Sequence, residues 1–491
     1  MGYAHLYGTK LLWNNIHLIL TPPSKITPPL QVQKGYLTHH GQEAAKLFGT
    51  YFHEYLFREG LLTDNVTTDL SHSYFRANSI QRSNITAAKF GEGLIPPISP
   101  LDTTKIPVHS YPLGEPGIPC QPDPTGITAG EPGKPDIPGI PDPVFDPIAK
   151  SLVMVPKVDL HLDPGQAARE AVAKYGSGEA LAIKYSDVLS HISEVLYVPP
   201  EKPTYLTKPP IPPTYDEEGK TEKEKDNLSL SCEPRGSLDP TLQTIKPFAL
   251  RPTPTEKIKY AGGFVQLDGL GYTNAAIDPF LMQYTDGFDD HDVAWDRLLL
   301  PVENSLSEQS KLITLQIDIE MRLSYVSKVQ SSNAATHVLR TMSQARYGSN
   351  GSSGVFGDVN SEIKVIISSD YYVAGLAGLL DLHWTLTGSG YQPDYCCSPN
   401  GTIVFELRKY KISKAYVVRA FYYAPTLGQL RGLTPLSLGA PPARERLKID
   451  GSDEISFDAF NTFLSKKIDQ RYVAPFSQVP PPGVLTDVPL K

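Results

Sequence analysis

The chain has 491 residues and carries 45 Lys and Arg against 53 Asp and Glu, for a formal net charge of −8. This length can form one large domain or two to three ordinary ones. The acidic balance argues against nucleic acid as a partner, because nucleic-acid binding normally requires a basic face. No apolar run reaches the roughly 18 residues that a membrane-spanning helix needs, so we expect a soluble protein without a transmembrane segment.

The first elements in the chain have the pattern of an α/β core. The short apolar run at residues 16–20 is followed by two prolines and predicts a buried strand. Apolar residues then recur at helical spacing between residues 44 and 56, and Gly60 is expected to end this helix. A second helix is predicted from about residue 80 to residue 91.

Proline-rich segments interrupt this pattern. Proline accounts for 46 of the 491 residues and is concentrated between residues 96 and 147. Segments of this composition form extended arms more readily than packed elements. We expect arms at residues 107–140 and 199–228, the second of which carries a charged run, and a proline-rich tail at residues 474–491.

The remaining elements place a helical block between two parts of the core. Helices are predicted at residues 164–175, 181–196, 373–380 and 457–464, and an all-helical stretch between about 276 and 342. Strands are predicted at residues 363–367, 403–407 and 415–423. One apolar stripe of the long helical block is expected to be core: Leu312, Leu315, Ile319, Leu323 and Val326. Strands that alternate with helices around a helical block predict an α/β sandwich with an inserted helical cap.

The chain can be divided on this basis. The expected parts are the first part of the α/β core (1–106), the first arm (107–140), the first part of the cap (141–198), the second arm (199–228), the second part of the cap with the return to the core (229–345), the second part of the core (346–473) and the tail (474–491).

The usual catalytic and binding motifs are weak. The glycine-rich stretch at residues 348–354 lacks the Lys and Ser/Thr of a phosphate-binding P-loop, and we expect a flexible loop there. The aspartates around His291 match no calcium loop and predict a solvated acidic turn. The vicinal pair Cys396 and Cys397 lies in a loop and has no zinc spacing. We therefore predict no metal site and no cofactor.

Several longer motifs, in contrast, follow one another in the order of a known family. Residues 37–41 open a helix, and residues 81–90 read QRSNITAAKF before Gly-Leu-Ile-Pro. Further matches lie at residues 141–147, at Ser369 and Asp370 with residues 376–386, and at residues 433–438. In these motifs the chain resembles the histidine acid phosphatase family, in its bacterial phytase and glucose-1-phosphatase branch, over nearly its whole length. The resemblance implies a histidine-phosphatase (phosphoglycerate-mutase-like) α/β sandwich with a helical cap and proline-rich insertions.

The resemblance also implies a chemistry. In the family a histidine attacks phosphorus, arginines hold the phosphoryl oxygens, and a carboxylic acid protonates the leaving oxygen. Arg82 matches a phosphate-binding arginine of the family, and Asp370 matches the proton donor. Arg82 and Lys25 form the expected remnant of a phosphate site. Two plainer interpretations remain open: Asp370 as an acceptor that caps the following helix, and Arg82 as a member of a structural ion pair.

Two departures from the family pattern indicate lost activity. Where the family has Arg-His-Gly-X-Arg-X-Pro, residues 21–28 read TPPSKITP, without the histidine and without either arginine. The histidine of the second motif is replaced by Ser369. Loss of a covalent nucleophile costs many powers of ten in rate, and the Lys25 ammonium cannot replace a bidentate guanidinium. No confident catalytic residue is left, and Asp370 marks a vestigial proton-donor position.

These departures predict a catalytically inactive, histidine-acid-phosphatase-like protein that serves as a structural or scaffold subunit of a large multi-protein assembly. The arms at residues 107–140 and 199–228 would contact its other protein subunits. Two alternatives remain open: a phosphomonoesterase of the acid phosphatase or phytase type with an unrecognised nucleophile, and a module that binds phosphate esters. The N-terminus shows no secretory signal pattern, so we expect an intracellular location and leave import into an organelle such as the mitochondrion open.

Overall fold

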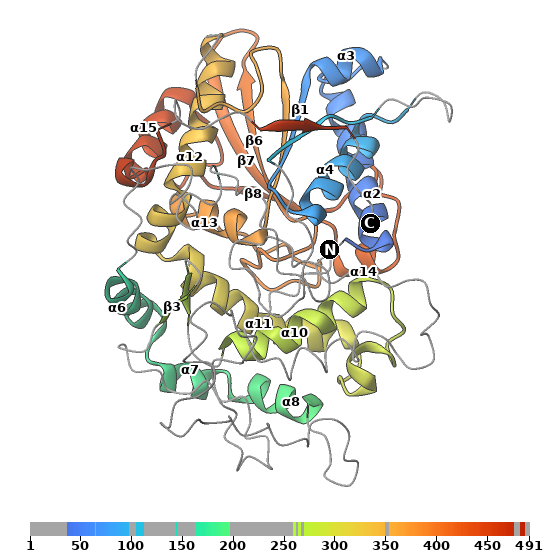
Figure 1. Cartoon of the computed structure of the whole chain (residues 1–491), viewed down its shortest axis with the longest axis vertical. Helices are drawn as coiled ribbons and strands as arrows, with labels where there is room; N and C mark the ends of the chain where they lie inside the picture. Colours follow the sequence, from blue (N-terminus) through green and yellow to red (C-terminus); the bar gives the residue numbers. More distant parts are fainter. Residues whose placement is uncertain are drawn as a thin grey trace, which may run out of the picture.

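The computed structural model describes residues 37–63, 65–97, 105–111, 144, 163–196, 259–261, 264–266, 270–348, 353–475 and 482–486. In these ranges, strands with flanking helices form an α/β core, and a second group of helices, the cap, lies below it in Figure 1. Lys25, the strand predicted at residues 16–20, the arm at residues 199–228 and most of the arm at residues 107–140 lie outside the described residues.

The first sheet contains four strands in the order β10–β2–β1–β5. The central strand β1 (Ser73–Ala77) pairs in parallel with β2 (Val108–Ser110) and with β5 (Ile363–Ile367). The edge strand β10 (Gly483–Leu485) pairs antiparallel with β2. Because β1 and β5 run in the same direction, their carboxyl ends meet at one edge of the sheet.

The second sheet is antiparallel and matches the predicted strands closely. It consists of β6 (Thr402–Lys409), β7 (Tyr416–Ala424) and β8 (Ala443–Leu447), and the short strand β9 (Ile455–Ser456) pairs with β7. In Figure 1, α2 and α4 lie on one side of the strands, and α12 and α15 lie on the other. The predicted α/β sandwich is therefore confirmed.

Two short strands lie in segments that we expected to form an arm and a tail rather than part of the core. β2 falls within the arm predicted at residues 107–140, and β10 falls within the proline-rich tail. The two strands pair with each other, and β2 also pairs with β1, so both segments contribute to the core sheet. The rest of the predicted division of the chain stays a prediction.

The helix α2 (His39–Arg58) forms as its sequence predicts. Its N-cap Thr38 accepts a hydrogen bond from the backbone N–H of Gly41 at 3.0 Å, which satisfies one of the unpaired donors of the first turn. Its buried face packs on α4 (Gln81–Leu94), and Phe52 packs against Tyr423 of β7 with ring centroids 5.2 Å apart. The short helix α3 (Val66–Ser71) follows.

Two glycines allow the backbones of α2 and α4 to approach each other closely. A Cβ atom on Gly49 of α2 would lie 2.1 Å from the carbonyl oxygen of Phe90, and one on Gly93 of α4 would lie 2.0 Å from that of Lys46. Both distances are far below van der Waals contact with backbone that cannot rotate away. The packing of the two helices therefore requires glycine at both positions.

Replacing Gly93 with Ala is expected to lower the free energy of unfolding by roughly 1–3 kcal/mol, because the added methyl group forces α2 and α4 apart. Urea unfolding followed by circular dichroism measures the change. Gly428→Ala is the matched control, since a Cβ at this helical glycine would have no atom closer than 4.0 Å. Equal stability of the Gly93→Ala variant and the natural chain would contradict the close approach.

The cap is built from helices on both sides of the second arm. They are α6 (Pro164–Tyr175), α7 (Gly178–Lys184), α8 (Ser186–Leu196), α10 (Leu270–Thr285) and α11 (Val302–Ile317), with the 3₁₀ turn η3 (Val293–Asp296) and the hairpin of β3 (Lys259–Ala261) and β4 (Phe264–Gln266). The helix predicted at residues 181–196 is broken into α7 and α8 at Tyr185. No described helix combines the length and the apolar character that crossing a bilayer requires.

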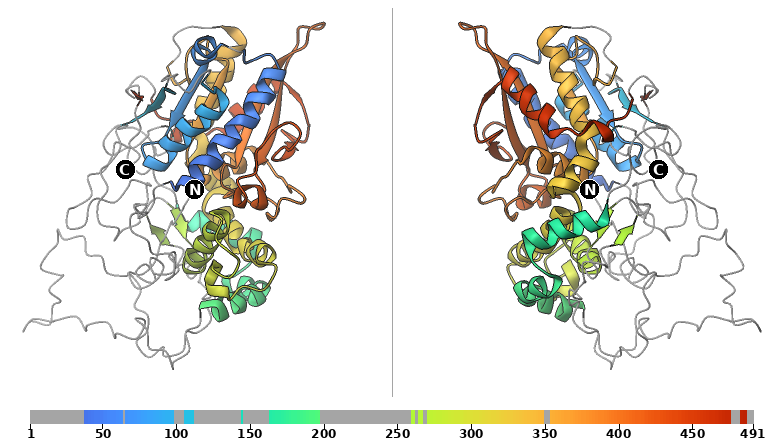
Figure 2. Two further views of the ribbon diagram at one scale, coloured as in Figure 1. Left: turned by 90° about the vertical axis from the view of Figure 1, so that its right-hand side faces the viewer. Right: turned by 90° about the vertical axis from the view of Figure 1, so that its left-hand side faces the viewer.

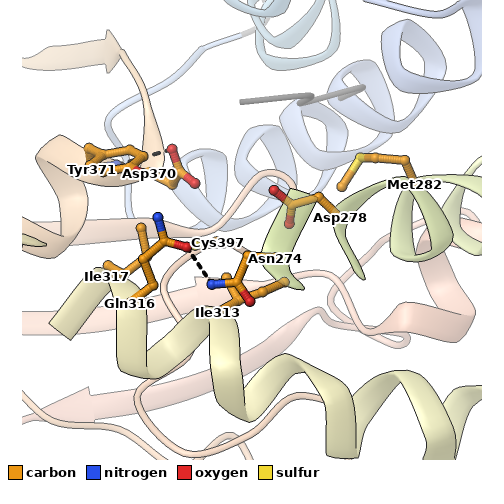
Figure 3. A pocket seen from close by; sticks show the side chains of 9 residues that line it. All are labelled: Asn274, Asp278, Met282, Ile313, Gln316, Ile317, Asp370, Tyr371 and Cys397. Atoms are coloured by element: carbon orange, nitrogen blue, oxygen red, sulfur yellow. Dashed lines mark hydrogen bonds between the residues drawn. The ribbon is translucent and has the colours of Figure 1, made fainter. Parts of the chain in front are cut away.

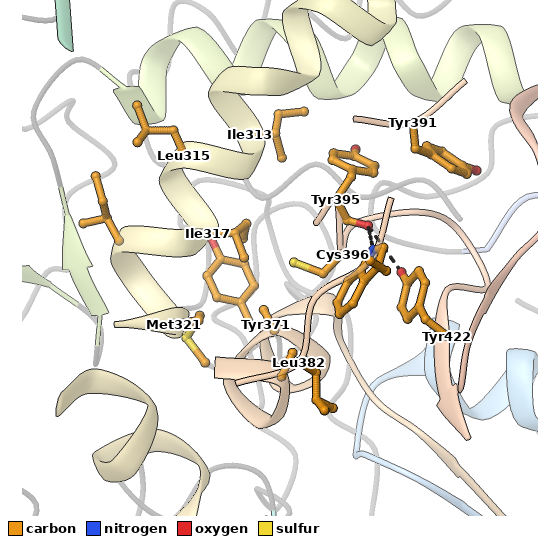
Figure 4. Packing of buried hydrophobic residues seen from close by; sticks show 14 of the residues in the cluster. Ile313, Leu315, Ile317, Met321, Tyr371, Leu382, Tyr391, Tyr395, Cys396 and Tyr422 are labelled. Carbon is orange, nitrogen blue, oxygen red and sulfur yellow. Dashed lines mark hydrogen bonds between the residues drawn. The ribbon is translucent and has the colours of Figure 1, made fainter. Parts of the chain in front are cut away.

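The remaining helices lie in the segment that leads from the cap back to the core and in the second part of the core. They are the π-helical turn η4 (Asp318–Arg322), α12 (Ser324–Tyr347), α13 (Asp370–Leu380), α14 (Leu427–Arg431), α15 (Phe457–Lys467) and the turn η5 (Gln470–Tyr472). The predicted stripe from Leu312 to Val326 is buried, which confirms it as core. Figure 4 shows how residues of α11 and η4, such as Ile317 and Met321, pack with Tyr371 of α13 and with Tyr395 and Tyr422 of the core. One hydrophobic cluster thus joins cap and core.

Candidate functional site

Two helices begin where the parallel strands β1 and β5 end. The chain passes from β1 into α4 and from β5 into α13, and the backbone N–H of Asn78 donates to the carbonyl oxygen of Ile367 at 3.1 Å, which holds the two strand ends together. The N-cap residues are Ile80 and Ser369, and within the described part of the chain neither side chain caps its helix. The first N–H groups of a helix have no intrahelical partner and carry partial positive charge. This edge of the sheet is therefore suited to an anion.

Asp370 is the first residue of α13. Its Oδ1 accepts the backbone N–H of Tyr371 at 3.1 Å, and the thiol of Cys397 also donates to its carboxylate. Burial raises the pKa of Asp370 above its usual value, although these hydrogen bonds and the positive charge of Arg82 oppose the shift. Asp370 therefore keeps its proton to higher pH than an ordinary aspartate, which is the property of a general acid.

Arg82 lies in the first turn of α4 and is 8% exposed. Its charge acts on Asp370, so the structure brings together two of the residues that the resemblance assigned to the site. Ser369, which replaces the family histidine, is buried at the N-cap beside Asp370. Lys25, the third predicted residue, lies outside the described residues. Ser369 holds the N-cap position, while Asp370 at the next position accepts the N–H of Tyr371 in the first turn, so the capping interpretation of Asp370 stays a prediction.

A small pocket opens next to Asp370, between α13 of the core and α10 and α11 of the cap (Figure 3). The described residues that line it are Asn274, Asp278, Met282, Ile313, Gln316, Ile317, Asp370, Tyr371 and Cys397. None of these lining residues carries a positive charge or is a histidine. Cys397 belongs to the predicted loop pair, whose thiols are both free, and its partner Cys396 is buried.

Asp278 of α10 brings a second carboxyl group to the pocket. Burial and the charge of Asp370 raise the pKa of Asp278 well above its usual value. The motifs did not predict this residue. The available signal was an acidic residue between Ile277 and Pro279 in an otherwise uncharged helix, which pattern alone cannot assign to a pocket.

A third carboxyl group, Glu320, lies behind the pocket in η4 and is 1% exposed. It accepts the Gln316 side-chain amide at 2.8 Å and the hydroxyl of Tyr371, and Gln316 in turn accepts the amide of Asn274. Burial raises the pKa of Glu320 to about 8. A π-helical turn is rare and frequently occurs at functional sites, and here it places a buried acid against two residues of the pocket.

No family model matches the chain. It is 22% identical over 462 residues to the glucose-1-phosphatase of Providencia rettgeri, covering 93% of this chain and 88% of that protein. A shorter match, 35% identical over 94 residues, relates it to Phytase AppA of Escherichia coli and spans 19% of this chain and only 21% of that relative.

Solved phytase structures are similar along the whole chain. The phytase of Citrobacter braakii has a TM-score of 0.63 at 19% identity and covers 95% of this chain and 96% of its own. The phytase of Hafnia alvei in complex with myo-inositol hexakis sulphate has a TM-score of 0.64 at 20% identity and covers 96% of each chain.

The comparisons correct the predicted role as a scaffold subunit of a large assembly. The relatives that align with most of the chain are a glucose-1-phosphatase and phytases, which favours a phosphatase-like function. The prediction was wrong because it treated the altered residues 21–28 and Ser369 as loss of the whole site. Arg82 and Asp370, at the edge where α4 and α13 begin, are still present. The resemblance to the histidine acid phosphatase family is confirmed, and the chain has the fold of that family.

Proposed function

We propose that the chain hydrolyses phosphate monoesters in the pocket beside Asp370. The proposal depends on one observation: the edge where α4 and α13 begin combines two helix N-termini, the cation Arg82 and a carboxyl group that keeps its proton. Phosphoryl transfer needs electrostatic stabilisation of the phosphoryl oxygens and a proton for the leaving oxygen. The phosphatase and phytase relatives support the same reaction class.

In this proposal each described residue has one task. Arg82 and the N–H groups of the two helices hold the phosphoryl oxygens. As the bond between phosphorus and the leaving oxygen breaks, the Asp370 carboxyl gives its proton to that oxygen, so the alcohol departs neutral. No histidine is among the described residues that line the pocket, so we assign the attack on phosphorus to a water molecule. The water oxygen forms the new bond to phosphorus and one water proton passes to the solvent, from which Asp370 is protonated again, so the products are the alcohol and inorganic phosphate.

The direct test is release of inorganic phosphate by the purified full chain. p-Nitrophenyl phosphate and glucose 1-phosphate serve as substrates across the acidic and neutral pH range. We expect saturable release that depends on enzyme concentration. Release no faster than in buffer, for both esters and at every pH, would overturn the proposal.

A second candidate function is binding of phosphate esters without hydrolysis. The observation that favours it is the absence from residues 21–28 of the histidine and both arginines of the family motif, together with Ser369 in place of the second histidine. Isothermal titration calorimetry separates the two candidates. Saturable heat with glucose 1-phosphate in the absence of phosphate release would favour the binding module.

Both candidates predict that Arg82→Gln weakens the binding of phosphate esters by about 10- to 100-fold, because a charge-assisted hydrogen bond to the phosphoryl oxygens is lost. Calorimetry with inorganic phosphate and with glucose 1-phosphate measures the change. Arg446→Gln is the control, because Arg446 of β8 pairs with Glu454 and lies outside the pocket. Unchanged affinity in the Arg82→Gln variant would remove Arg82 from the site.

A further inference from the structure

The pocket and its phosphate-binding edge have opposite electrostatic character. On the phosphate side are Arg82 and the positive ends of α4 and α13. On the other side the described lining contains two carboxyl groups, Asp278 and Asp370, and no cation. A ligand that fits both sides carries negative charge at one end and hydrogen-bond donors or positive charge at the other.

Asp278 is the second carboxyl group among the described residues that line the pocket, and a carboxylate can bind a cation. Asp370 is committed to the leaving oxygen in the proposed reaction, so Asp278 is the described carboxyl left for the rest of the substrate. In Figure 3, Asp278 extends from α10 on the side of the pocket opposite Asp370. A carboxylate that is partly removed from water is stabilised most by a partner of opposite charge.

A second, independent feature also calls for a hydrogen-bond donor. The amide nitrogen of Asn274 donates to the carbonyl oxygen of Leu312 at 3.0 Å and to the side chain of Gln316, which fixes the orientation of the amide. Its oxygen Oδ1 is buried and has no hydrogen-bond partner among the described residues, and Asn274 is 5% exposed. A buried acceptor of this kind is normally satisfied, and this one belongs to a residue that lines the pocket.

We propose that the substrate is a phosphate monoester of an amino alcohol, with its phosphate at Arg82 and its ammonium group at Asp278. The inference rests on the proposed function and names the substrate class of the same site. In a two-carbon amino alcohol, the nitrogen lies roughly 4 Å from the ester oxygen, so one small substrate can present its ester oxygen to Asp370 and its ammonium group to Asp278, which line the same pocket. The same charges disfavour a ligand with many phosphates, because a second phosphate would meet Asp278.

The test compares two esters of the same shape, O-phosphoethanolamine and n-propyl phosphate, in which the ammonium group is replaced by methyl. We expect the natural chain to prefer phosphoethanolamine by about 10- to 100-fold in kcat/KM. In the Asp278→Asn variant this ratio should fall to near one. Asp187→Asn, an exposed aspartate of α8 in the cap and outside the pocket, should keep the ratio of the natural chain.

The pH dependence of this preference separates a direct contact from a merely structural role. The groups that act on Asp278, or on which its charge acts, are Asp370, Cys397 and Tyr395. Burial raises the pKa of Asp278, and so does the charge of Asp370 when Asp370 is ionised, so the Asp278 carboxylate is scarce at acidic pH. In the active form of the site Asp370 is neutral and does not oppose this ionisation. The preference for the ammonium ester should therefore increase as pH rises, and the Asp278→Asn variant should show no such increase.

Three outcomes would overturn the inference while phosphate release persists: equal use of the two esters, a preference that survives in Asp278→Asn, or faster turnover of inositol hexakisphosphate than of phosphoethanolamine. Absence of release from every ester would contradict the proposed hydrolysis instead. In that event calorimetry with the same two esters decides the inference alone. Tighter binding of phosphoethanolamine that is lost in Asp278→Asn supports it, and equal binding overturns it.

Discussion

Replacing Asp370 with Asn is expected to lower the rate of phosphate release by roughly 10²- to 10⁴-fold, the usual contribution of a positioned general acid. The asparagine has nearly the same shape, and its oxygen can still accept the Tyr371 N–H that Asp370 accepts at 3.1 Å. It has no acidic proton for the leaving oxygen. The loss should therefore appear in kcat, while the fold and the phosphate-binding edge are retained.

The choice of leaving group makes this prediction specific. A p-nitrophenolate ion leaves without much protonation, whereas an alkoxide needs a proton as the bond breaks. The Asp370→Asn variant should lose far more activity on an alkyl phosphate than on p-nitrophenyl phosphate. Asp458→Asn is the matched control, since Asp458 is an exposed aspartate in the first turn of α15. Equal losses on both esters would show that Asp370 is not the proton donor.

The pH profile gives an independent check of the same residue. Burial raises the pKa of Asp370, so the protonated, active form persists above the usual pKa of an aspartate and is lost as pH rises further. The rate on an alkyl phosphate should consequently fall on the alkaline side of this raised pKa. That fall should be absent from the residual activity of the Asp370→Asn variant.

The elements that the sequence predicted are those whose own pattern determines them. α2 carries its cap at Thr38 and an apolar stripe, and β5 was predicted with the bounds that the structure shows. β2 and β10 were not predicted as strands, because each has only three residues and lies in a proline-rich context. Such strands depend on pairing with distant parts of the chain, which local periodicity does not reveal.

The same distinction applies to the site. Arg82 and Asp370 were identified from motifs, because the resemblance to the family matches each of them to a family residue. Asp278 and Glu320 were missed, although both contribute acidic groups at or behind the pocket. Their environment arises only when α10 and η4 of the cap pack against α13, and no local pattern marks a carboxyl group that will be buried by another segment.

The buried acid Glu320 is expected to have a large effect on the free energy of unfolding. It is 1% exposed, its Oε2 has no hydrogen-bond partner among the described residues, and burial raises its pKa from 4.5 to about 8. The charge of Asp370 raises the pKa further, while hydrogen bonds from Gln316 and Tyr371 lower it. At neutral pH the folded chain therefore holds Glu320 mainly in its neutral form, whereas the unfolded chain ionises it.

The sign of the pH dependence follows from this difference. Between the usual pKa of 4.5 and about 8, the folded chain binds more protons at Glu320 than the unfolded chain. The free energy of unfolding must then decrease as pH rises through this window, and the full cost is reached above its upper end. One pKa unit corresponds to about 1.4 kcal/mol, so Glu320 costs at most about 5 kcal/mol at alkaline pH.

Glu320→Gln should remove this cost, because glutamine resembles the neutral acid and is not ionised at any pH. The variant and the natural chain should have similar stability in acid, and the variant should become more stable by a few kcal/mol as pH rises past 8. Urea unfolding at a series of pH values measures the difference. Asp278 and Asp370 also have raised pKa values, but they are present in both proteins, so the difference reports Glu320 together with its coupling to Asp370.

The exposed Glu308 of α11 is the control for this substitution, and Glu308→Gln should leave the pH dependence of unfolding unchanged. A Glu320→Gln variant whose stability falls with pH as steeply as that of the natural chain would mean that Glu320 is already ionised in the folded state. The buried acid would then need a cation behind the pocket. Because Asp370 repels negative charge at Glu320, an ionised Glu320 would also raise the pKa of Asp370 further and extend the alkaline range of catalysis. The pH dependence of unfolding and the pH dependence of activity of the Glu320→Gln variant therefore both test the coupling between Glu320 and Asp370.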